Sequence, residues 1–182
     1  MRAMKISDTH WSPHVICPDE RMRRWLIDHG SLTARIERRC DRFGVRLLRQ
    51  SFAAPAPDER RMIGLRGGMR CVVREVTLDG DGRSVVFAHS VLVHRALRGP
   101  WRMVAGLGRR PLGAALFADP RIERHPLHFR RLQCGNALYR RACDLVDRPP
   151  AALWARRSLF VLRGARLLVT EVFLPAILDL AP

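Results

Sequence analysis

The spacing of hydrophobic and polar positions changes once along this chain, from a helical period near its start to the alternation of β-strands further on. Over 19–29 the apolar residues recur at intervals of three and four, the period of an amphipathic helix: Met22, Trp25 and Leu26. Asp19 is a candidate N-cap for this helix, and Gly30 follows it as a stop signal. Ser31 can cap a second helical turn over 32–36. The pattern therefore predicts a helix, a tight corner and another helix.

Beyond position 43, apolar and β-branched residues gather in segments that are typical of strands. These segments lie at 45–52, 69–78, 84–93, 153–162 and 166–174. The DGDG sequence at 79–82 and Gly164 stand where tight turns would join neighbouring strands into hairpins. Short helices are expected at 111–117 and 136–146. This order predicts an α+β fold, with one domain over residues 1–182 that contains a mainly antiparallel β-sheet and flanking helices.

Two charged residues interrupt the apolar faces of these predicted strands. Because alternate residues of a strand share a face, Arg74 lies beside Val72 and Val76. By the same count, Glu171 lies beside Val169. A charge among apolar side chains is costly to bury unless it has a partner. Both residues are therefore expected to have one.

Three explanations of these two charges are open. Arg74 and Glu171 pair with each other or with neighbours as an internal ion pair, or the strand register is shifted by one residue. Alternatively, the two residues line a polar pocket over the sheet. In that case the ligand is a small anion with an acid at one end and a hydroxyl at the other. The pattern alone does not choose among them.

The composition indicates a folded and strongly basic protein. The chain has 182 residues, 47% of them hydrophobic, and a formal net charge of +16. Of its 33 basic residues only Lys5 is a lysine. Such a charge is typical of nucleic-acid-binding surfaces, but the sequence has no run of five like charges and no basic segment interleaved with aromatics. We interpret the arginines as compositional drift, expect no nucleic-acid partner, and note that a basic surface favours a small anionic substrate.

The sequence lacks the motifs of several common sites and segments. Its apolar runs fall short of the roughly 18 residues that a membrane span needs, and no signal-peptide core is present near the N-terminus. The five cysteines form no CxxC pair, which argues against a zinc ribbon and fits a reducing compartment. Walker and GxSxG motifs are absent. We therefore expect a cytoplasmic protein with no membrane span, no metal and no cofactor.

The histidines give weaker signals. His125 and His128 have the spacing of a metal-binding pair but flank Pro126, so we interpret them as surface residues. His89 shares a predicted strand face with Phe87 and other apolar residues. It is interpreted as a core or pocket-edge histidine rather than a catalytic base.

Five segments of this chain, in order, resemble the chorismate pyruvate-lyase family. They are WLIDHGSLTARI from Trp25, VVREVTL from Val72, LGRRPLGAALF from Leu107, LWARRSLF from Leu153 and LLVTEVFLP from Leu167. The resemblance implies a cofactor-free lyase that converts chorismate to 4-hydroxybenzoate and pyruvate, the first step of ubiquinone synthesis in many bacteria. It also implies an antiparallel sheet with the ligand enclosed in a pocket beneath helical flaps. The matching region runs from about residue 25 to about residue 175.

The resemblance further implies which residues touch the ligand. Arg74 corresponds to an arginine expected to hold the ring carboxylate, and Glu171 to a glutamate expected to meet the ring hydroxyl, so both are candidate catalytic residues. Leu32 and Leu112 correspond to substrate-binding positions expected to contribute chiefly backbone amides near the carboxylate. Leu32 stands where a methionine is also seen in the family, which matters little for a backbone contact.

Two features depart from the family pattern. His89 replaces an arginine, and the segment 119–150 is longer and more basic than in compact relatives.

A second class of function shares a related fold. Some bacterial transcription regulators use it as an effector-binding domain, which senses a small molecule without converting it. About two dozen residues precede the matching region, fewer than the DNA-binding domain of such a regulator needs, so the enzyme is favoured. We expect a monomer whose small-molecule partners are chorismate and 4-hydroxybenzoate.

Overall fold

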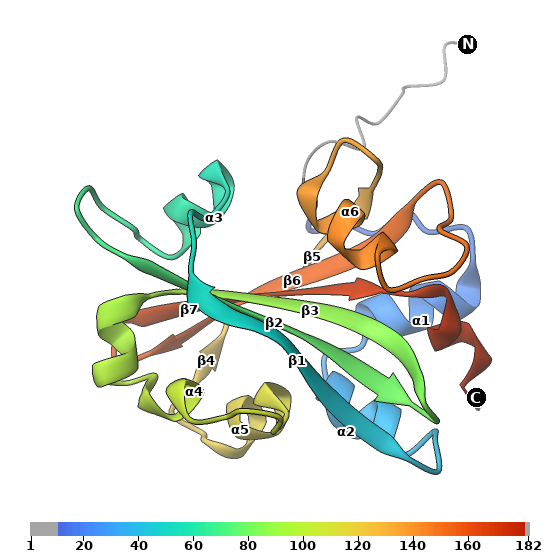
Figure 1. The fold of residues 1–182 in the computed structure, drawn as a ribbon, viewed down its shortest axis with the longest axis horizontal. Helices are drawn as coiled ribbons and strands as arrows, with labels where there is room; N and C mark the ends of the chain where they lie inside the picture. The colour runs from blue at the N-terminus through green and yellow to red at the C-terminus, as the bar shows by residue number, and fades with distance from the viewer. Residues whose placement is uncertain (1–10, 181–182) are drawn as a thin grey trace.

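A seven-stranded β-sheet forms the centre of the computed structural model, which describes residues 11–180 (Figure 1). The strands are β1 (Phe43–Phe52), β2 (Cys71–Gly80), β3 (Arg83–Val93), β4 (Glu123–Arg124), β5 (His128–Leu132), β6 (Leu153–Leu162) and β7 (Ala165–Phe173). Their order across the sheet is β1-β2-β3-β7-β6-β4, and β5 also pairs with β6. All of these strand pairs are antiparallel, so the predicted α+β class is confirmed.

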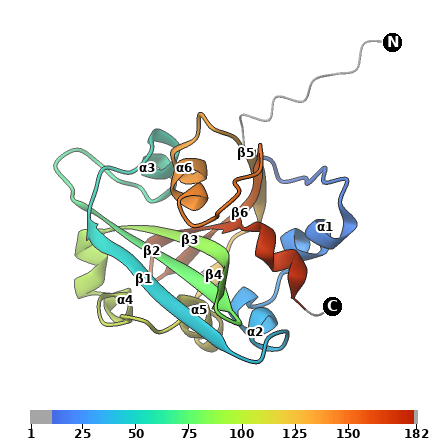
Figure 2. The same ribbon diagram turned by 45° about the vertical axis from the view of Figure 1, so that its right-hand side comes forward.

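Short helices cover both faces of the sheet. They are α1 (Glu20–Ile27), α2 (Leu32–Glu37), α3 (Pro57–Met62), α4 (Arg102–Ala105), α5 (Leu112–Ala118) and α6 (Ala137–Cys143), with 3₁₀ turns η1 (His94–Arg98) and η2 (Pro175–Asp179). Helices α2, α4 and α5 lie on one side of the sheet, and α3 and α6 lie on the other (Figures 1 and 2). Within residues 11–180 no helix is long and apolar enough to cross a membrane.

The two faces of the sheet hold separate apolar clusters. On one face, Leu112 and Leu116 of α5 pack with Leu167 of β7. On the other face, Leu138 of α6 packs with Phe87 of β3. The central strands are therefore buried on both sides, which makes a charged side chain on either face conspicuous.

The predicted helix caps and hairpin turns are present. Asp19 accepts hydrogen bonds from backbone N–H groups in the first turn of α1, and the Ser31 hydroxyl accepts one from the N–H of Ala34, 3.3 Å away. Between β2 and β3, Asp81 and Gly82 have φ angles of 51° and 80°. Two successive residues with positive φ are the requirement of a type I′ hairpin turn, which Asp-Gly meets readily. These local signals were correctly read from the sequence.

The strand register places Arg74 and Glu171 on the same face of the sheet. Arg74 on β2 pairs with Ser90 on β3, which in turn pairs with Val169 on β7. One step along the same face, Ala88 of β3 pairs with Glu171 of β7. From the ordinary spacing of strands and of alternate residues, the Cα atoms of Arg74 and Glu171 lie about 12 Å apart.

Candidate functional site

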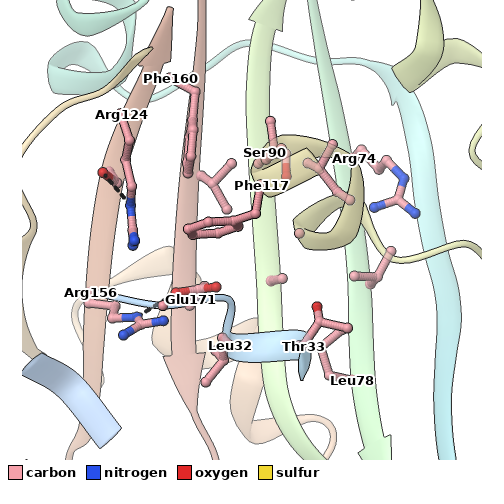
Figure 3. A pocket seen from close by; sticks show the side chains of 18 residues that line it. Leu32, Thr33, Arg74, Leu78, Ser90, Phe117, Arg124, Arg156, Phe160 and Glu171 are labelled. Atoms are coloured by element: carbon pink, nitrogen blue, oxygen red, sulfur yellow. Dashed lines mark hydrogen bonds and ion pairs between the residues drawn. The ribbon is translucent and has the colours of Figure 1, made fainter. Parts of the chain in front are cut away.

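A pocket lies between the sheet and the helices α2 and α5, and all four residues predicted to touch a ligand line it (Figure 3). Its floor consists of alternate residues of β2, β3, β7 and β6, with β4 at one side. Its roof consists of the first turn of α2 and of helix α5, from its first residues to Leu116 and Phe117. The predicted residues Leu32, Arg74, Leu112 and Glu171 thus come together from four separate elements.

Arg74 is a buried cation that forms no ion pair with any carboxylate of the described residues. It is 1% exposed, and its Nη2 donates hydrogen bonds to the carbonyl oxygens of Gly108 and Arg110, at 3.0 and 3.2 Å. Its Nε is buried and has no hydrogen-bond partner. Burial lowers the pKa of Arg74, and no neighbouring acid opposes this shift. A buried guanidinium in this state is suited to bind an anionic ligand.

Glu171 has a different cation as its partner. Arg156, its direct neighbour on β6, places Nε 2.5 Å from Oε2 of Glu171. Arg156 is completely buried, and its Nη1 also donates to the carbonyl oxygens that end α1: those of Trp25, Leu26 and Asp28. The Oε1 atom of Glu171 makes no hydrogen bond within the described residues. This oxygen is therefore available to a ligand.

Direct pairing between Arg74 and Glu171, one of the possibilities considered from sequence, is wrong. The two residues lie two strands apart, with β3 between them, and each has its own neighbours. Pairing with a neighbour is correct for Glu171 but not for Arg74. Both residues nevertheless line the pocket, and Figure 3 shows them at opposite ends of it.

The roof presents first-turn backbone to the pocket. Leu32 is the first residue of α2 and Leu112 the first of α5, and Pro111 provides no side-chain cap for α5. The first backbone N–H groups of a helix have no partner within the helix, so they can donate to a ligand. The two helices also approach closely at Gly113. A Cβ atom added there would lie only 2.8 Å from Oγ1 of Thr33, so a larger residue would not fit without a shift. This close contact joins the two halves of the roof.

Arg124 of β4 is a further cation in the pocket, which the sequence did not single out. Its Nε donates to the hydroxyl of Ser158 at 3.3 Å, and its Nη1 to the carbonyl oxygen of His29 at 2.5 Å. Burial is the main cause that lowers the pKa of Arg124, and the nearby charge of Arg156 adds to it. In Figure 3 its side chain extends toward the pair formed by Arg156 and Glu171.

A second cluster of charges lies on the opposite face of the sheet. His89 is 3% exposed, with Nδ1 2.8 Å from Oε1 of Glu75 and Nε2 3.2 Å from Oε1 of Glu59. Burial alone would lower the pKa of His89, but its contacts with the two glutamates raise it overall. Arg49 and Arg141 also pair with Glu75. His89 is therefore a paired, buried histidine on the face that does not hold the pocket.

The other histidines give no indication of a metal site. Within the described part of the chain, no three His, Cys, Asp or Glu side chains are grouped so that they could hold a metal ion. His125 is exposed and lies 3.5 Å from Glu123, and His128 is partly buried beside the carbonyl of Pro126.

Comparison with known proteins identifies close relatives of this chain. A sequence model of the chorismate lyase family matches residues 10–181. A probable chorismate pyruvate-lyase of Azoarcus sp. (strain BH72) is 58% identical over 166 residues, which cover 89% of this chain and 88% of the relative. A probable chorismate pyruvate-lyase of Nitrosospira multiformis is 47% identical over 182 residues, which cover 100% of both chains.

Solved structures with a similar fold come from transcription regulators. The C-terminal domain of the histidine utilization repressor from Pseudomonas syringae pv. tomato aligns with a TM-score of 0.54 over 74% of this chain and 93% of that domain. Sequence identity is 11%, so this likeness concerns the fold alone.

Proposed function

This chain belongs to the chorismate lyase family, and we propose that it converts chorismate to 4-hydroxybenzoate and pyruvate in the pocket between the sheet and helices α2 and α5. The observation that carries the proposal is the pairing pattern inside the pocket. At one end Arg74 is buried without a carboxylate partner among the described residues, and at the other Glu171 has one free oxygen. A ring with an acid at one end and a hydroxyl opposite would satisfy both groups.

The reaction itself needs little covalent help from the protein. The ether bond at ring carbon C3 of chorismate breaks, and its electron pair leaves on the enolpyruvate oxygen. Carbon C4 loses a proton, and the electron pair of that bond becomes part of the aromatic ring. The proton is taken up by the enolpyruvate, which becomes pyruvate. Because aromatisation supplies the driving force, we expect positioning and the exclusion of water to account for most of the catalysis.

Four residues position the ring in this proposal. Arg74 binds the ring carboxylate through two donors, and the backbone amides of Leu32 and Leu112 donate to the same carboxylate. Glu171, which Arg156 holds in place, accepts a hydrogen bond from the C4 hydroxyl. The carboxylate and the hydroxyl persist in 4-hydroxybenzoate, so the same contacts hold the product, and we expect its release to be slow.

The wider setting follows from the same reaction. All the residues that it uses come from one chain, so a monomer suffices, and none of them requires a metal or an organic cofactor. The product is the aromatic precursor of ubiquinone, which places the enzyme at the first step of that pathway. We propose that the enzyme acts in the cytoplasm.

Incubation of the purified protein with chorismate tests the proposal. The reaction contains EDTA and no nucleotide, and 4-hydroxybenzoate and pyruvate are measured separately. We expect equal amounts of both products, with turnover unaffected by the chelator. A protein that is stabilised by 4-hydroxybenzoate but forms neither product would be a sensor, and the enzyme proposal would be wrong.

A further inference from the structure

The pocket carries more positive charge than the product requires. Three guanidinium groups and one carboxylate line it, those of Arg74, Arg124, Arg156 and Glu171, which gives a formal charge of +2. Chorismate carries two carboxylates, one on the ring and one on the enolpyruvyl side chain, whereas 4-hydroxybenzoate carries only the first. The charge of the pocket therefore matches the substrate and exceeds that of the aromatic product.

We propose that Arg124 binds the carboxylate of the enolpyruvyl side chain and thereby favours chorismate over 4-hydroxybenzoate. This inference rests on the proposed function. Arg124 is not one of the four residues proposed to position the ring. Arg124 would be a substrate-specificity residue in direct contact with the part of chorismate that leaves as pyruvate.

The other two arginines of the pocket already have their own roles. Arg74 stands at the end of the pocket where the ring carboxylate is placed. Arg156 is neutralised by Glu171 and donates to three carbonyl oxygens at the end of α1. Within the described residues, the hydrogen bonds of Arg124 go only to a hydroxyl and a carbonyl, those of Ser158 and His29. Glu171 and Asp28 lie close enough to attract Arg124, but no carboxylate of the described residues accepts a hydrogen bond from it. Arg124 can therefore still donate to an anionic ligand.

The position of Arg124 agrees with the geometry of the substrate. The enolpyruvyl ether is attached at C3, beside the C4 hydroxyl that Glu171 is proposed to accept. The side chain of chorismate must therefore lie near the Glu171 end of the pocket. Arg124 reaches that end, since it and Arg156 donate to the carbonyl oxygens of adjacent residues, His29 and Asp28 (Figure 3).

The surroundings of Arg124 strengthen its interaction with an anion. Its guanidinium lies 5.1 Å from the ring centre of Phe117 and 5.6 Å from that of Phe160. Phe160 is buried and covers one side of the guanidinium, whereas Phe117 is partly exposed. A charge pair is stronger where water is excluded, as on the side of Phe160. The hydroxyl of Ser158 fixes the guanidinium from the side of the sheet.

The test compares two ligands that differ in one carboxylate. The first is 4-hydroxybenzoate, and the second is 3-(carboxymethoxy)-4-hydroxybenzoate, a stable diacid whose added carboxylate stands in for that of the enolpyruvyl group. Binding of both is measured by calorimetry for the wild type, for Arg124→Met and for the control Arg121→Met. The control removes one positive charge three residues away, from a side chain that is 66% exposed and pairs with Asp119.

We expect Arg124→Met to weaken binding of the diacid roughly 10- to 100-fold, as the loss of a charged hydrogen bond implies. Its affinity for 4-hydroxybenzoate should stay within about twofold of the wild type, and kcat/KM for chorismate should fall in parallel with diacid affinity. Arg121→Met should change neither affinity.

Equal losses for both ligands would show that Arg124 only supports the fold of the pocket, and the inference would be overturned. Unchanged diacid affinity would overturn it as well. If Arg124→Met does not fold, Arg124→Lys replaces it, with the same selective loss expected on a smaller scale. These binding measurements do not depend on turnover, so a wild type that fails to convert chorismate would contradict the proposed function separately.

Discussion

Arg156 and Glu171 lie directly opposite each other on β6 and β7, with Nε of Arg156 2.5 Å from Oε2 of Glu171. The same guanidinium donates to the last carbonyl oxygens of α1, including that of Asp28. The corner between α1 and α2 forms part of the pocket roof, through Gly30 and Leu32. One buried side chain therefore orients a proposed ligand group and attaches part of the roof to the sheet.

Replacement of Arg156 by Met should destabilise the protein by about 3 to 5 kcal/mol, because it leaves the Glu171 carboxylate without a cation and three carbonyl oxygens without a donor. Urea unfolding measures the effect. The control is Arg83→Met, which breaks an ion pair of similar length, 2.6 Å to Asp179, between side chains that are about 60% exposed. The control should cost less than about 1 kcal/mol. Similar losses for both variants would show that burial of the Arg156 pair is energetically unimportant.

Replacement of Arg74 by Lys should lower kcat/KM for chorismate by about tenfold or more. The lysine keeps the charge but cannot offer two parallel donors to a carboxylate while it also contacts the carbonyl oxygens of Gly108 and Arg110. Steady-state kinetics and a thermal melt of each protein separate catalysis from folding. Arg109→Lys, an exposed change in the same loop, should stay within about twofold of the wild type. Near-native kinetics of Arg74→Lys would mean that this arginine is structural.

The elements that the sequence predicted are those with strong local signals. Asp19 and Ser31 cap their helices through short-range hydrogen bonds, and Asp81 with Gly82 has few turn conformations to choose from. Strands β4 and β5 were missed because 123–132 is rich in charged residues and contains Pro126. Both strands depend on long-range pairing: each pairs with β6, and β5 also forms a bridge with Ser12. Helix α3 was also missed, although the sequence carries a signal for its start: Pro57 stands at its first position, ahead of acidic residues.

The difference between local signals and long-range pairing also decides which pocket residues could be predicted. Alternation placed Arg74 and Glu171 on buried faces, and it would also have found Arg156, which shares a face with Phe160 in a predicted strand. Alternation cannot tell which charges meet, because that depends on the order of strands across the sheet. Arg124 lies on a strand of two residues, where no period can be read. Arg124 could therefore be found as a pocket residue only from the three-dimensional structure.

The buried pair of His89 and Glu75 should make stability fall as pH rises above neutrality. The pKa of His89 is higher in the folded protein than its ordinary value of 6.5. Its contribution is therefore fully present below pH 6.5 and is lost as pH rises through the folded pKa. The pKa of Glu75 is lowered, because its contacts with His89 and two arginines outweigh burial, so its own contribution is lost only in acid.

Urea unfolding of the wild type and His89→Gln between about pH 5 and pH 9 checks this prediction. This range begins above the ordinary pKa of glutamate and ends well above that of histidine. The wild type should exceed the variant most at the acidic end, and the difference should shrink steadily toward pH 9. The exposed change His125→Gln should give no such trend. A difference that is constant with pH would show that His89 is neutral in the folded protein.

Replacement of Glu171 by Gln tests whether this residue binds ligand or only neutralises Arg156. Glutamine is nearly isosteric, and Arg156 keeps its three carbonyl partners, so the variant should fold with a modest loss of thermal stability. The free oxygen of Glu171 is proposed to accept the ligand hydroxyl, and a charged hydrogen bond contributes about 1.5 to 3 kcal/mol. The affinity for 4-hydroxybenzoate should therefore fall roughly 10- to 100-fold. Turnover of chorismate should slow as well.

Thermal melts with and without saturating 4-hydroxybenzoate separate the two roles, because a ligand that binds only the folded state raises the melting temperature in proportion to the logarithm of its relative concentration. The Gln variant should melt close to the wild type without ligand but show a much smaller ligand-induced shift. Glu123→Gln, at a carboxylate that is 71% exposed on β4, should keep the full shift. A Glu171→Gln protein that melts far below the wild type yet keeps the full shift would refute the ligand contact, since its carboxylate would then serve only the ion pair with Arg156.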